Sequence, residues 1–302
     1  MSINTKYCVK RQNTQLFTQY LLLFYINHQN LFLILIQLKK SLFLYYNILC
    51  IVIFNSQFLF FGGVIMEKKE LMYEGKAKKV YSTDDPALCI VSYKDDATAF
   101  NGEKKGTIVG KGVVNNRMSN FMFQLLEKNG IPTDFVEELN DRDAVLKRVE
   151  IVPLEVIVRN KAAGSFSKRF GVPEGTAFEC PTLEYCLKDD DLGDPMINDS
   201  QIIAIGAAKQ EELDTIAKYT MKINEVMIDF FKKCGVDLID FKIEFGRLPD
   251  GTIILADEIS PDTCRFWDVE TGEKLDKDRF RRDMGGVEEA YAEMMKRVGL
   301  GE

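Results

Sequence analysis

Residues 239–246 alternate between charged and apolar side chains, a pattern typical of a strand with one polar face. Asp240, Lys242 and Glu244 share that face, because successive side chains of a strand point to opposite sides of the sheet. An Asp-Gly turn then predicts a hairpin whose return strand brings Asp257 near Glu244. Two carboxylates in that position could hold Mg2+ against nucleotide phosphates, as phosphoryl transfer requires. The alternative is the solvent-exposed face of a half-buried sheet.

A glycine followed by lysines separates the first two expected strands, as Gly75, Lys76, Ala77 and Lys78. A glycine lets the backbone approach a ligand closely, and the neighbouring lysines could neutralise phosphate charge. The segment matches neither the P-loop nor the dinucleotide-binding glycine pattern. We therefore weigh a phosphate-binding loop against an exposed, lysine-rich hairpin tip.

An apolar strand at residues 154–158 leads to Arg159 and then to a loop of small residues that ends at Ser165. Such a loop offers backbone N–H groups, a hydroxyl and a guanidinium to a phosphate or carboxylate. A plain strand-to-helix connection with a capping serine is the alternative. After the hairpin, Asp262 and Arg265 follow closely enough to lie beside the predicted metal site.

The chain has 302 residues and a formal net charge of -7, but its acids are unevenly distributed. Residues 1–65 contain no Asp or Glu, so residues 66–302 carry 34 Lys and Arg against 46 Asp and Glu, a net charge of -12. This acidic part argues against nucleic-acid binding, although small anionic substrates need only a local basic cluster. Its acidic run at residues 189–191 could bind a substrate amino group or form a solvated loop.

His28 is the single histidine of the sequence and lies within residues 1–65. Residues 66–302 therefore cannot carry Ser-His-Asp or Cys-His catalysis, or a usual zinc site. Carboxylates remain as metal ligands, which favours a hard cation and Mg2+ first of all. The five cysteines of this part form no Cys-x-x-Cys pair, as expected for reduced thiols in a cytoplasmic protein.

Strand and helix periodicities follow one another along residues 66–302 without an internal repeat or a long linker. Strands are expected at residues 71–73, 79–82, 88–93, twice within 144–159, and at 182–187, 236–245 and 253–259. Helices are expected at residues 111–129, 209–234, 276–284 and 287–298. This mixture predicts an α+β fold with two lobes, residues 66–150 and 151–302, and a cleft between them.

Residues 1–65 are rich in Leu, Ile, Phe, Tyr and Asn, as translated AT-rich non-coding DNA would be. Gly62 and Gly63 precede Met66 at the usual distance of a bacterial ribosome-binding site from a start codon, if they are encoded GGA-GGT. We therefore expect translation to start at Met66 and residues 1–65 to be an upstream artefact. A membrane anchor is the alternative, because the uncharged stretch 42–61 is long enough to cross a bilayer.

Several segments, taken in order, resemble the SAICAR synthetase (phosphoribosylaminoimidazole-succinocarboxamide synthase) family. They are residues 75–81 (GKAKKVY), 151–155 (IVPLE) with Arg159, Gly164 and Ser165 after them, 240–246 (DFKIEFG) and 257–262 (DEISPD). The resemblance covers essentially all of residues 66–302, including 111–116 and 276–286. Residues 1–65 have no counterpart in the family pattern. Thr263 and Cys264 stand where many members carry Gly-Ser.

The resemblance implies a two-lobed α+β fold related to ATP-grasp enzymes, with the nucleotide between the lobes. It implies the reaction of ATP, carboxyaminoimidazole ribonucleotide (CAIR) and L-aspartate to SAICAR, ADP and phosphate, with Mg2+ held by Glu244 and Asp257. The ATP-binding residues that it implies are Gly75, Lys76, Ala77, Lys78, Lys242 and Glu244. The residues implied to bind CAIR are Glu155, Arg159, Ser165 and Arg265, and those implied in catalysis are Lys242, Arg159 and Asp262.

Two other classes of protein remain as alternatives. A small-molecule kinase on a related scaffold would share the metal-binding hairpin but would need no L-aspartate. A membrane-anchored binding protein would use residues 1–65 as its anchor, but it would leave the carboxylates of the hairpin unexplained. The family resemblance further implies a cytoplasmic homodimer, with neither a membrane nor a nucleic acid as partner of residues 66–302.

Overall fold

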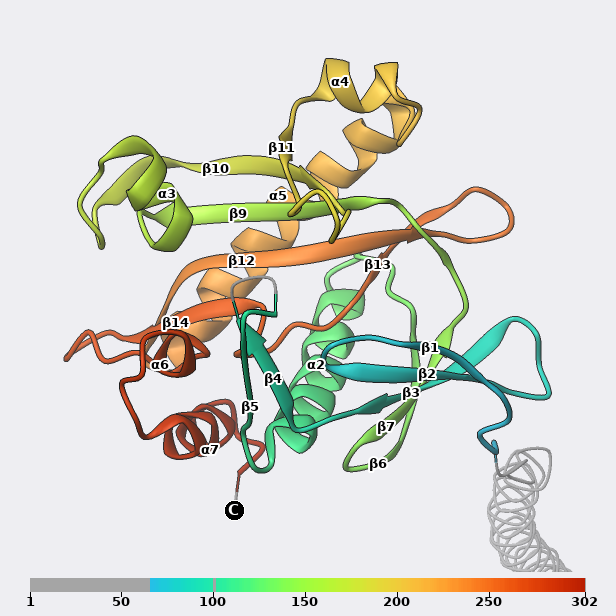
Figure 1. Ribbon diagram of the computed structural model, residues 1–302, viewed down its shortest axis with the longest axis horizontal. Helices are drawn as coiled ribbons and strands as arrows, with labels where there is room; N and C mark the ends of the chain where they lie inside the picture. The colour runs from blue at the N-terminus through green and yellow to red at the C-terminus, as the bar shows by residue number, and fades with distance from the viewer. Residues whose placement is uncertain (1–65, 100–101, 302) are drawn as a thin grey trace, which may run out of the picture. The chain divides into compact units, whose positions relative to one another are not determined.

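Figure 1 shows the computed structural model of the chain, in which residues 66–99 and 102–301 are described. Glu67–Glu302 form one compact unit. The expectations about residues 1–65, including the start at Met66 and the membrane anchor, lie outside the described residues. Among the helices that are described, none is both long and apolar enough to span a bilayer.

The first sheet has five antiparallel strands in the order β1-β2-β3-β7-β6. Its strands are β1 (Leu71–Glu74), β2 (Lys78–Ser82), β3 (Leu88–Tyr93), β6 (Phe135–Asn140) and β7 (Asp143–Lys147). The apolar run of β3 places it in the middle of the sheet, where Ile90 and Val91 are buried. The strands expected at 71–73, 79–82 and 88–93 are confirmed. Strand β2 begins at Lys78, the last residue of the segment 75–78, which we call the glycine–lysine loop.

Between the two halves of this sheet, the chain forms a hairpin and a long helix. The hairpin consists of β4 (Asp96–Ala99) and β5 (Lys104–Thr107), and the helix is α2 (Lys111–Lys128), as expected at 111–129. Met118, Met122 and Leu126 recur at helical spacing on the buried side of α2 and pack into the main core. Helix α2 therefore carries Lys111, at its first turn, into the interior of the unit.

The second sheet has seven strands arranged around the long strand β12 (Val236–Arg247). Its main path is β11-β10-β9-β12-β13, and both β8 and β14 pair with β12 as well. The other strands are β8 (Glu150–Ile151), β9 (Leu154–Lys161), β10 (Ala177–Leu187), β11 (Met196–Ile197), β13 (Ile253–Ala256) and β14 (Cys264–Asp268). The remaining helices are α3 (Gly164–Phe170), α4 (Asp199–Ala204), α5 (Gln210–Lys233), α6 (Asp278–Arg281) and α7 (Val287–Arg297).

The two faces of β12 differ, and this difference positions the candidate site. Phe241, Ile243 and Phe245 are almost fully buried in the main core, which the apolar stripe of α5 completes on one face of the sheet (Figure 1). Each such side chain contributes about 1.5–3 kcal/mol on burial. The alternation predicted from the sequence is thereby confirmed. Asp240, Lys242 and Glu244 consequently point to the opposite face.

Three expectations about element boundaries need correction. The return strand expected at 253–259 ends at Ala256, because Asp257 adopts a left-handed backbone conformation with φ 67°. Residues 144–159 contain parts of three strands rather than two, since the short β8 stands before Pro153. The helix expected at 276–284 is reduced to the single turn of α6. The Asp276 carboxylate accepts from the backbone N–H groups of Phe266 and Asp278 before the turn, and Asp283 after it has a left-handed conformation with φ 53°.

Candidate active site

The hairpin of β12 and β13 brings the predicted metal ligands together, as the sequence pattern indicates. Glu244 pairs with Ala256, so Asp257 stands one residue beyond the position opposite Glu244. Lysines interleave with these carboxylates: Lys242 Nζ lies 2.6 Å from Glu155 Oε1 and 3.4 Å from Glu244 Oε1. We call the whole group the lysine–carboxylate cluster; its members are Lys78, Glu155, Lys188, Lys242, Glu244, Asp257 and Glu258.

Lys78 links the first sheet to this cluster. Its ammonium forms an ion pair with Asp257 and lies 2.9 Å from Glu258 Oε2. On the other side of the cluster, Lys188 Nζ lies 2.7 Å from Glu244 Oε1. The cluster is therefore built from both sheets, with Lys78 at the start of β2 facing carboxylates that follow β13.

Burial and crowding control the charges of the cluster. Burial, with the nearby Asp257 carboxylate, raises the pKa of Glu258 to about 7. Burial opposes ionisation of Asp257 as well, but Lys78, a hydrogen bond with Glu258 and the Lys242 charge together outweigh it and hold the pKa of Asp257 well below its usual range. Burial would lower the pKa of Lys242, yet Glu244, Asp257 and Glu155 raise it. The cluster thus presents fixed ammonium groups beside oxygen ligands.

The two lysines of the glycine–lysine loop, Lys76 and Lys78, lie in different surroundings. Gly75 N–H donates to the Lys78 carbonyl at 2.9 Å, and the Ala77 carbonyl accepts from Lys94 N–H at 2.8 Å, so the loop is a tight turn held to the sheet. Lys78 enters the lysine–carboxylate cluster. Lys76 is half-exposed and lies 2.7 Å from Asp190 Oδ1, which places the acidic run 189–191 next to the loop.

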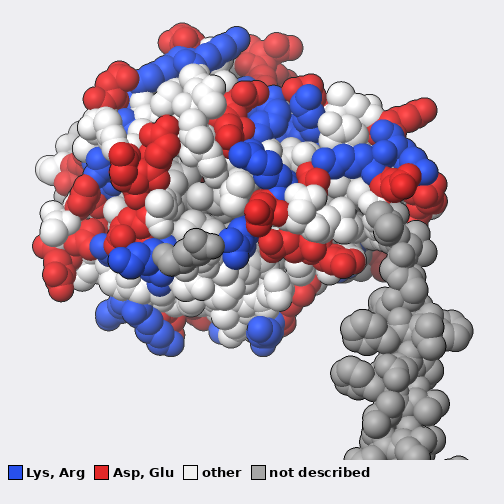
Figure 2. Space-filling view, turned by 90° about the horizontal axis from the view of Figure 1, so that it is seen from below, with Lys and Arg blue, Asp and Glu red and all other residues white. Residues whose placement is uncertain are grey.

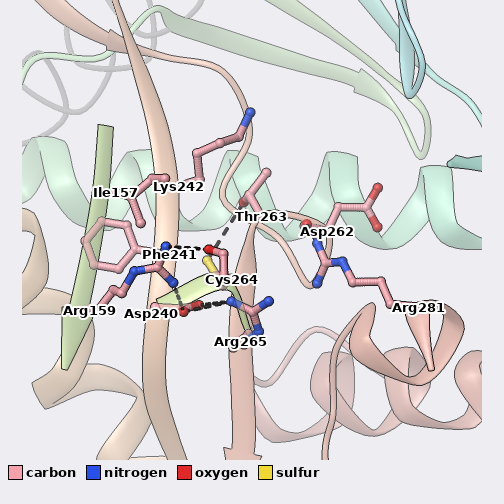
Figure 3. A pocket seen from close by; sticks show the side chains of 11 residues that line it. Ile157, Arg159, Asp240, Phe241, Lys242, Asp262, Thr263, Cys264, Arg265 and Arg281 are labelled. Carbon is pink, nitrogen blue, oxygen red and sulfur yellow. Dashed lines mark hydrogen bonds and ion pairs between the residues drawn. The ribbon is translucent and has the colours of Figure 1, made fainter. Parts of the chain in front are cut away.

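A cavity of about 170 Å³ opens beside the cluster (Figure 3). We call it the arginine cavity; its lining residues are Ile157, Arg159, Ser165, Asp240, Phe241, Lys242, Asp262, Thr263, Cys264, Arg265 and Arg281. Lys242 belongs both to this lining and to the lysine–carboxylate cluster. An anion in the cavity and an anion on the cluster would therefore share one ammonium group.

Carboxylates fix the arginines of the cavity in place. Arg159 donates to Asp240 at 2.9 Å and to Ser165 Oγ at 3.1 Å, and Glu184 accepts from its other N–H groups. Arg265 donates to the same Asp240 at 2.8 Å, as the dashed lines of Figure 3 show. Planar guanidinium groups held in this way are suited to phosphate and carboxylate ligands.

Gly164 allows this arrangement at the start of α3. Its φ is 53°, and a Cβ atom there would lie 2.3 Å from Arg265 Nη2. A larger residue would push the guanidinium out of the cavity. Ser165, the next residue, then turns its hydroxyl to Arg159, so this loop is a built part of the cavity and not only a connection.

Asp262 lies in the cavity wall and is held by groups from three other segments. Lys111 Nζ is 2.9 Å from its Oδ2, Lys277 Nζ is 3.4 Å from the same oxygen, and the Tyr291 hydroxyl donates to its Oδ1 at 2.5 Å. Burial opposes its ionisation, but Lys277 and Lys111 outweigh this and hold the pKa of Asp262 far below its usual range. Asp262 is therefore a fixed anion.

The two residues that depart from the family pattern also reach the cavity. Cys264 is 1% exposed, and burial raises the pKa of its thiol, so the group is neutral. Thr263 turns its hydroxyl to the Glu258 carbonyl at 3.0 Å. The pair therefore closes the loop against β12 and adds no charge to the cavity.

The site residues expected from the sequence belong to these two groups, except Gly75, Lys76 and Ala77 of the glycine–lysine loop. Several contributing residues are not evident in the sequence: Lys111, Glu184, Lys188, Glu258, Asp278 and Arg281. They are scattered over several elements and lack a local pattern of their own. Glu258 has one available signal, because it adjoins Asp257 at the end of the predicted hairpin.

The donor set of the cluster fits a hard divalent cation. Within the described residues, no group of three or more His, Cys, Asp and Glu side chains is arranged to hold a metal ion unaided. Mg2+ at nucleotide sites needs only one or two carboxylates, since phosphate oxygens and water complete its shell. Glu244 and Asp257, which both lie close enough to Lys242 to raise its pKa, supply this number of carboxylates.

Comparison with known proteins gives consistent results. The family model described as SAICAR synthetase matches residues 71–298. The phosphoribosylaminoimidazole-succinocarboxamide synthase of Lachnoclostridium phytofermentans is 65% identical over 235 residues, 78% of this chain and 100% of that protein. The enzyme of that name from Clostridium botulinum (strain Alaska E43 / Type E3) is 61% identical over 233 residues, 77% of this chain and 99% of that protein.

Solved structures show the same fold. The crystal structure of phosphoribosylaminoimidazole-succinocarboxamide synthase from Ehrlichia chaffeensis matches with a TM-score of 0.76 and 42% identity, over 77% of this chain and 100% of that chain. A SAICAR synthetase (Type-2) in complex with ADP matches with a TM-score of 0.74 and 46% identity, over 76% of this chain and 97% of that chain. The α+β fold predicted from the sequence is confirmed, and the chain belongs to the SAICAR synthetase family.

Proposed function

We propose that this chain joins L-aspartate to the carboxylate of CAIR and hydrolyses ATP to ADP and phosphate in doing so, the ligase step of purine biosynthesis that gives SAICAR. The family membership and the relative solved with ADP support this assignment. The observation that carries it is the position of Lys242, which lines the arginine cavity and also belongs to the lysine–carboxylate cluster. One ammonium group can thus contact both the transferred phosphate and the carboxylate that receives it.

The chemistry requires an activated carboxylate, because a free carboxylate is a poor electrophile. An oxygen of the CAIR carboxylate attacks the γ-phosphorus of ATP, the bond to the ADP oxygen breaks, and an acyl phosphate forms. The L-aspartate nitrogen then attacks the acyl carbon, phosphate leaves with the former carboxylate oxygen, and the nitrogen loses a proton to give the amide. Positioning and charge neutralisation suffice for such phosphoryl transfer, which agrees with a site without histidine.

ATP would lie on the lysine–carboxylate cluster, with Lys76 and Lys78 near its phosphates and Gly75 and Ala77 shaping the turn beneath them. The ion pair between Lys78 and Asp257 already places the ammonium where phosphate oxygens would replace the carboxylate. Lys242, held by Glu155 and Glu244, would reach the transferred phosphate. Lys78 and Lys242 are kept cationic by their carboxylate neighbours.

Mg2+ would be held by Glu244 and Asp257. When bound, it supplies positive charge to the phosphate oxygens during transfer. Glu244 is now paired with Lys188 and Lys242, and both ammonium groups remain close enough to accompany a bound phosphate. Asp257 is kept ionised by Lys78, as a metal ligand must be.

CAIR would occupy the arginine cavity. Arg159, Ser165 and Arg265 converge there and would bind its phosphate and carboxylate, with Glu155 beside the reacting end. Asp240 bonds both arginines, so the guanidinium groups are oriented before the substrate arrives. Asp262 is a fixed anion of the wall, where its charge would attract the ammonium form of L-aspartate.

Other features of the proposal concern organisation and partners. The first sheet lies within residues 71–147 and the second within 150–268, which supports a nucleotide-binding lobe up to residue 150 and a substrate-binding lobe after it. Free thiols at all described cysteines agree with a cytoplasmic location. On the face in Figure 2, basic and acidic side chains are interspersed, unlike a nucleic-acid-binding surface. The homodimer that the family resemblance implies can be tested by measuring the mass of the purified chain in sedimentation.

The proposal is tested by ADP release from the purified chain with ATP, Mg2+ and CAIR, with and without L-aspartate. We expect ADP release to require both CAIR and L-aspartate and to match the formation of a product with the mass of SAICAR. ADP release that is indifferent to L-aspartate would indicate a small-molecule kinase and refute the ligase. A folded, ATP-binding chain that releases no ADP would refute the assigned substrates.

A further inference from the structure

Residues 188–194, between β10 and β11, form a turn that we call the acidic turn. Asp190 Oδ1 in this turn lies 2.7 Å from Lys76 Nζ of the glycine–lysine loop. At the start of the turn, Lys188 Nζ lies 2.7 Å from Glu244 Oε1. In the proposed function, Lys76 contacts the phosphates of ATP and Glu244 holds Mg2+. The acidic turn therefore contacts one residue of each kind.

The charges of the acidic turn resemble those of ATP with Mg2+. Asp190 offers an anion to Lys76, as a phosphate oxygen would. Lys188 offers a cation to Glu244, as Mg2+ would. On leaving Glu244, the Lys188 ammonium can turn to a bound phosphate, because opposite charges attract, whereas Asp190 and a phosphate repel each other. Asp190 is therefore the group of the acidic turn that opposes ATP.

The Asp190 carboxylate also interacts with cations of the lysine–carboxylate cluster. The ammonium of Lys76, which donates to it, lowers the pKa of Asp190 most; burial opposes this effect, and the charges of Lys188 and Lys242 add to it. Asp190 is therefore ionised and close enough to Lys242 to interact with its charge. A phosphate that binds beside Lys242 would lie near this anion and be repelled by it.

The acidic turn keeps its shape through contacts within itself. Asp189 Oδ1 accepts from Asp191 N–H at 3.0 Å, and Asp194 Oδ1 accepts from Asp189 N–H at 3.0 Å. The Asp190 carboxylate takes no part in these bonds, and its side chain is 69% exposed. Its ion pair with Lys76 can therefore break while the turn stays folded.

We propose that Asp190 competes with the phosphates of ATP for Lys76, so that the acidic turn is a built-in competitor that nucleotide must displace; the inference rests on the proposed function. When nucleotide binds, Lys76 exchanges the Asp190 carboxylate for a phosphate oxygen, and the turn separates from the glycine–lysine loop. The opposite arrangement is a clasp, in which Asp190 keeps Lys76 and holds the two segments together over bound nucleotide. The repulsion between Asp190 and phosphate favours competition.

The first test is Asp190→Asn, which removes the charge and keeps the size of the side chain. The Kd of ADP with Mg2+ and the KM for ATP should both fall about two- to fivefold, the range for an ion pair between half-exposed groups. Asp191→Asn is the matched control, because it makes the same charge change in the next residue. Asp191 is exposed, forms no ion pair within residues 66–99 and 102–301, and should leave both constants close to the wild-type values.

A double-mutant cycle separates the ion pair from a general effect of charge. Lys76→Met removes the partner of Asp190, and by itself it should weaken the binding of ADP. Addition of Asp190→Asn to Lys76→Met should then leave the Kd of ADP unchanged, because the contact for which the two anions compete is absent. A decrease in Kd as large as in the wild-type background would overturn the inference.

The second test needs no variant. A carbodiimide couples an ammonium group to a carboxylate that touches it, so treatment of the wild type should link Lys76 to Asp190, and the linked peptides are identified by mass. ADP with Mg2+ should prevent this link. A link that forms equally well with and without ADP and Mg2+ would show the clasp and overturn the inference.

The failure of this inference can be distinguished from the failure of the proposed function. An unchanged or increased Kd of ADP in Asp190→Asn would overturn the inference, while L-aspartate-dependent ADP release by the wild type upholds the ligase. If the wild type releases no ADP with CAIR and L-aspartate, the assigned substrates are wrong. A lower Kd of ADP in Asp190→Asn would still uphold the competition in that case, because the binding measurement requires no turnover.

Discussion

Gly164→Ala tests how the arginine cavity is built. The residue has φ 53°, and the new Cβ would lie 2.3 Å from Arg265 Nη2, so the guanidinium must leave its place beside Asp240. The left-handed conformation costs an alanine about 1–2 kcal/mol in folding free energy. Displacement of Arg265 removes a charge-assisted bond to the CAIR phosphate or carboxylate, about 1.5–3 kcal/mol. We expect a loss of about ten- to a hundredfold in kcat/KM for CAIR.

The matched control is Gly171→Ala at the other end of the same helix. Gly171 also has a positive φ, 66°, but its added Cβ would meet nothing within 4 Å. Both variants should lose roughly 2–8 °C in thermal midpoint, whereas only Gly164→Ala should lose kcat/KM. The assay is steady-state ADP release with CAIR varied at saturating ATP and L-aspartate. Equal kcat/KM values in the two variants would refute the role given to Gly164 and Arg265.

Three further predictions concern charge and hydrogen bonding. Glu244→Ala and Asp257→Ala should each abolish turnover, with the fold retained on circular dichroism, and chelation of Mg2+ should abolish turnover reversibly. A rate above about a tenth of the wild-type rate in either variant, a loss of less than roughly 1.4 kcal/mol of barrier, would contradict their assignment as metal ligands. Burial raises the pKa of Asp276 to about 7 from 3.8, so the folded state holds this proton more tightly than the unfolded state and stability is lost as pH rises through 7. Asp276→Asn should therefore remove about 2–3 kcal/mol of the decline in unfolding free energy between pH 5 and pH 8, and an unchanged decline in denaturant titrations would count against it. Tyr291→Phe should cost about 1.5–3 kcal/mol of unfolding free energy by removing the bond to Asp262, which chemical denaturation would detect; a variant as stable as the wild type would show that this bond adds nothing.

Sequence periodicity predicts the elements that carry the hairpin site. The alternation on β12 and the Asp-Gly turn require only local rules, and the structure places Glu244 opposite the residue before Asp257. The turn cannot predict where the return strand ends. That end depends on the left-handed conformation of Asp257, which turns its carboxylate to Lys78 of the other sheet.

Contacts between distant segments explain what the sequence does not reveal. Lys111 and Tyr291 are separated from Asp262 by 151 and 29 residues, and each lies on a helix whose pattern indicates only a buried face. Lys188 meets Glu244 because β10 and β12 lie on either side of β9. No residue type or spacing marks such partners. They become visible only when the sheet order is known.

The central claim is that ATP phosphorylates the carboxylate of CAIR before L-aspartate attacks. The most direct test uses CAIR labelled with 18O in its carboxylate, with ATP, Mg2+, L-aspartate and the purified chain. The claim predicts that each turnover transfers one labelled oxygen to inorganic phosphate and leaves the other in the new amide. Phosphate that carries no label, released in step with SAICAR, would contradict an acyl phosphate and the mechanism built on Lys242.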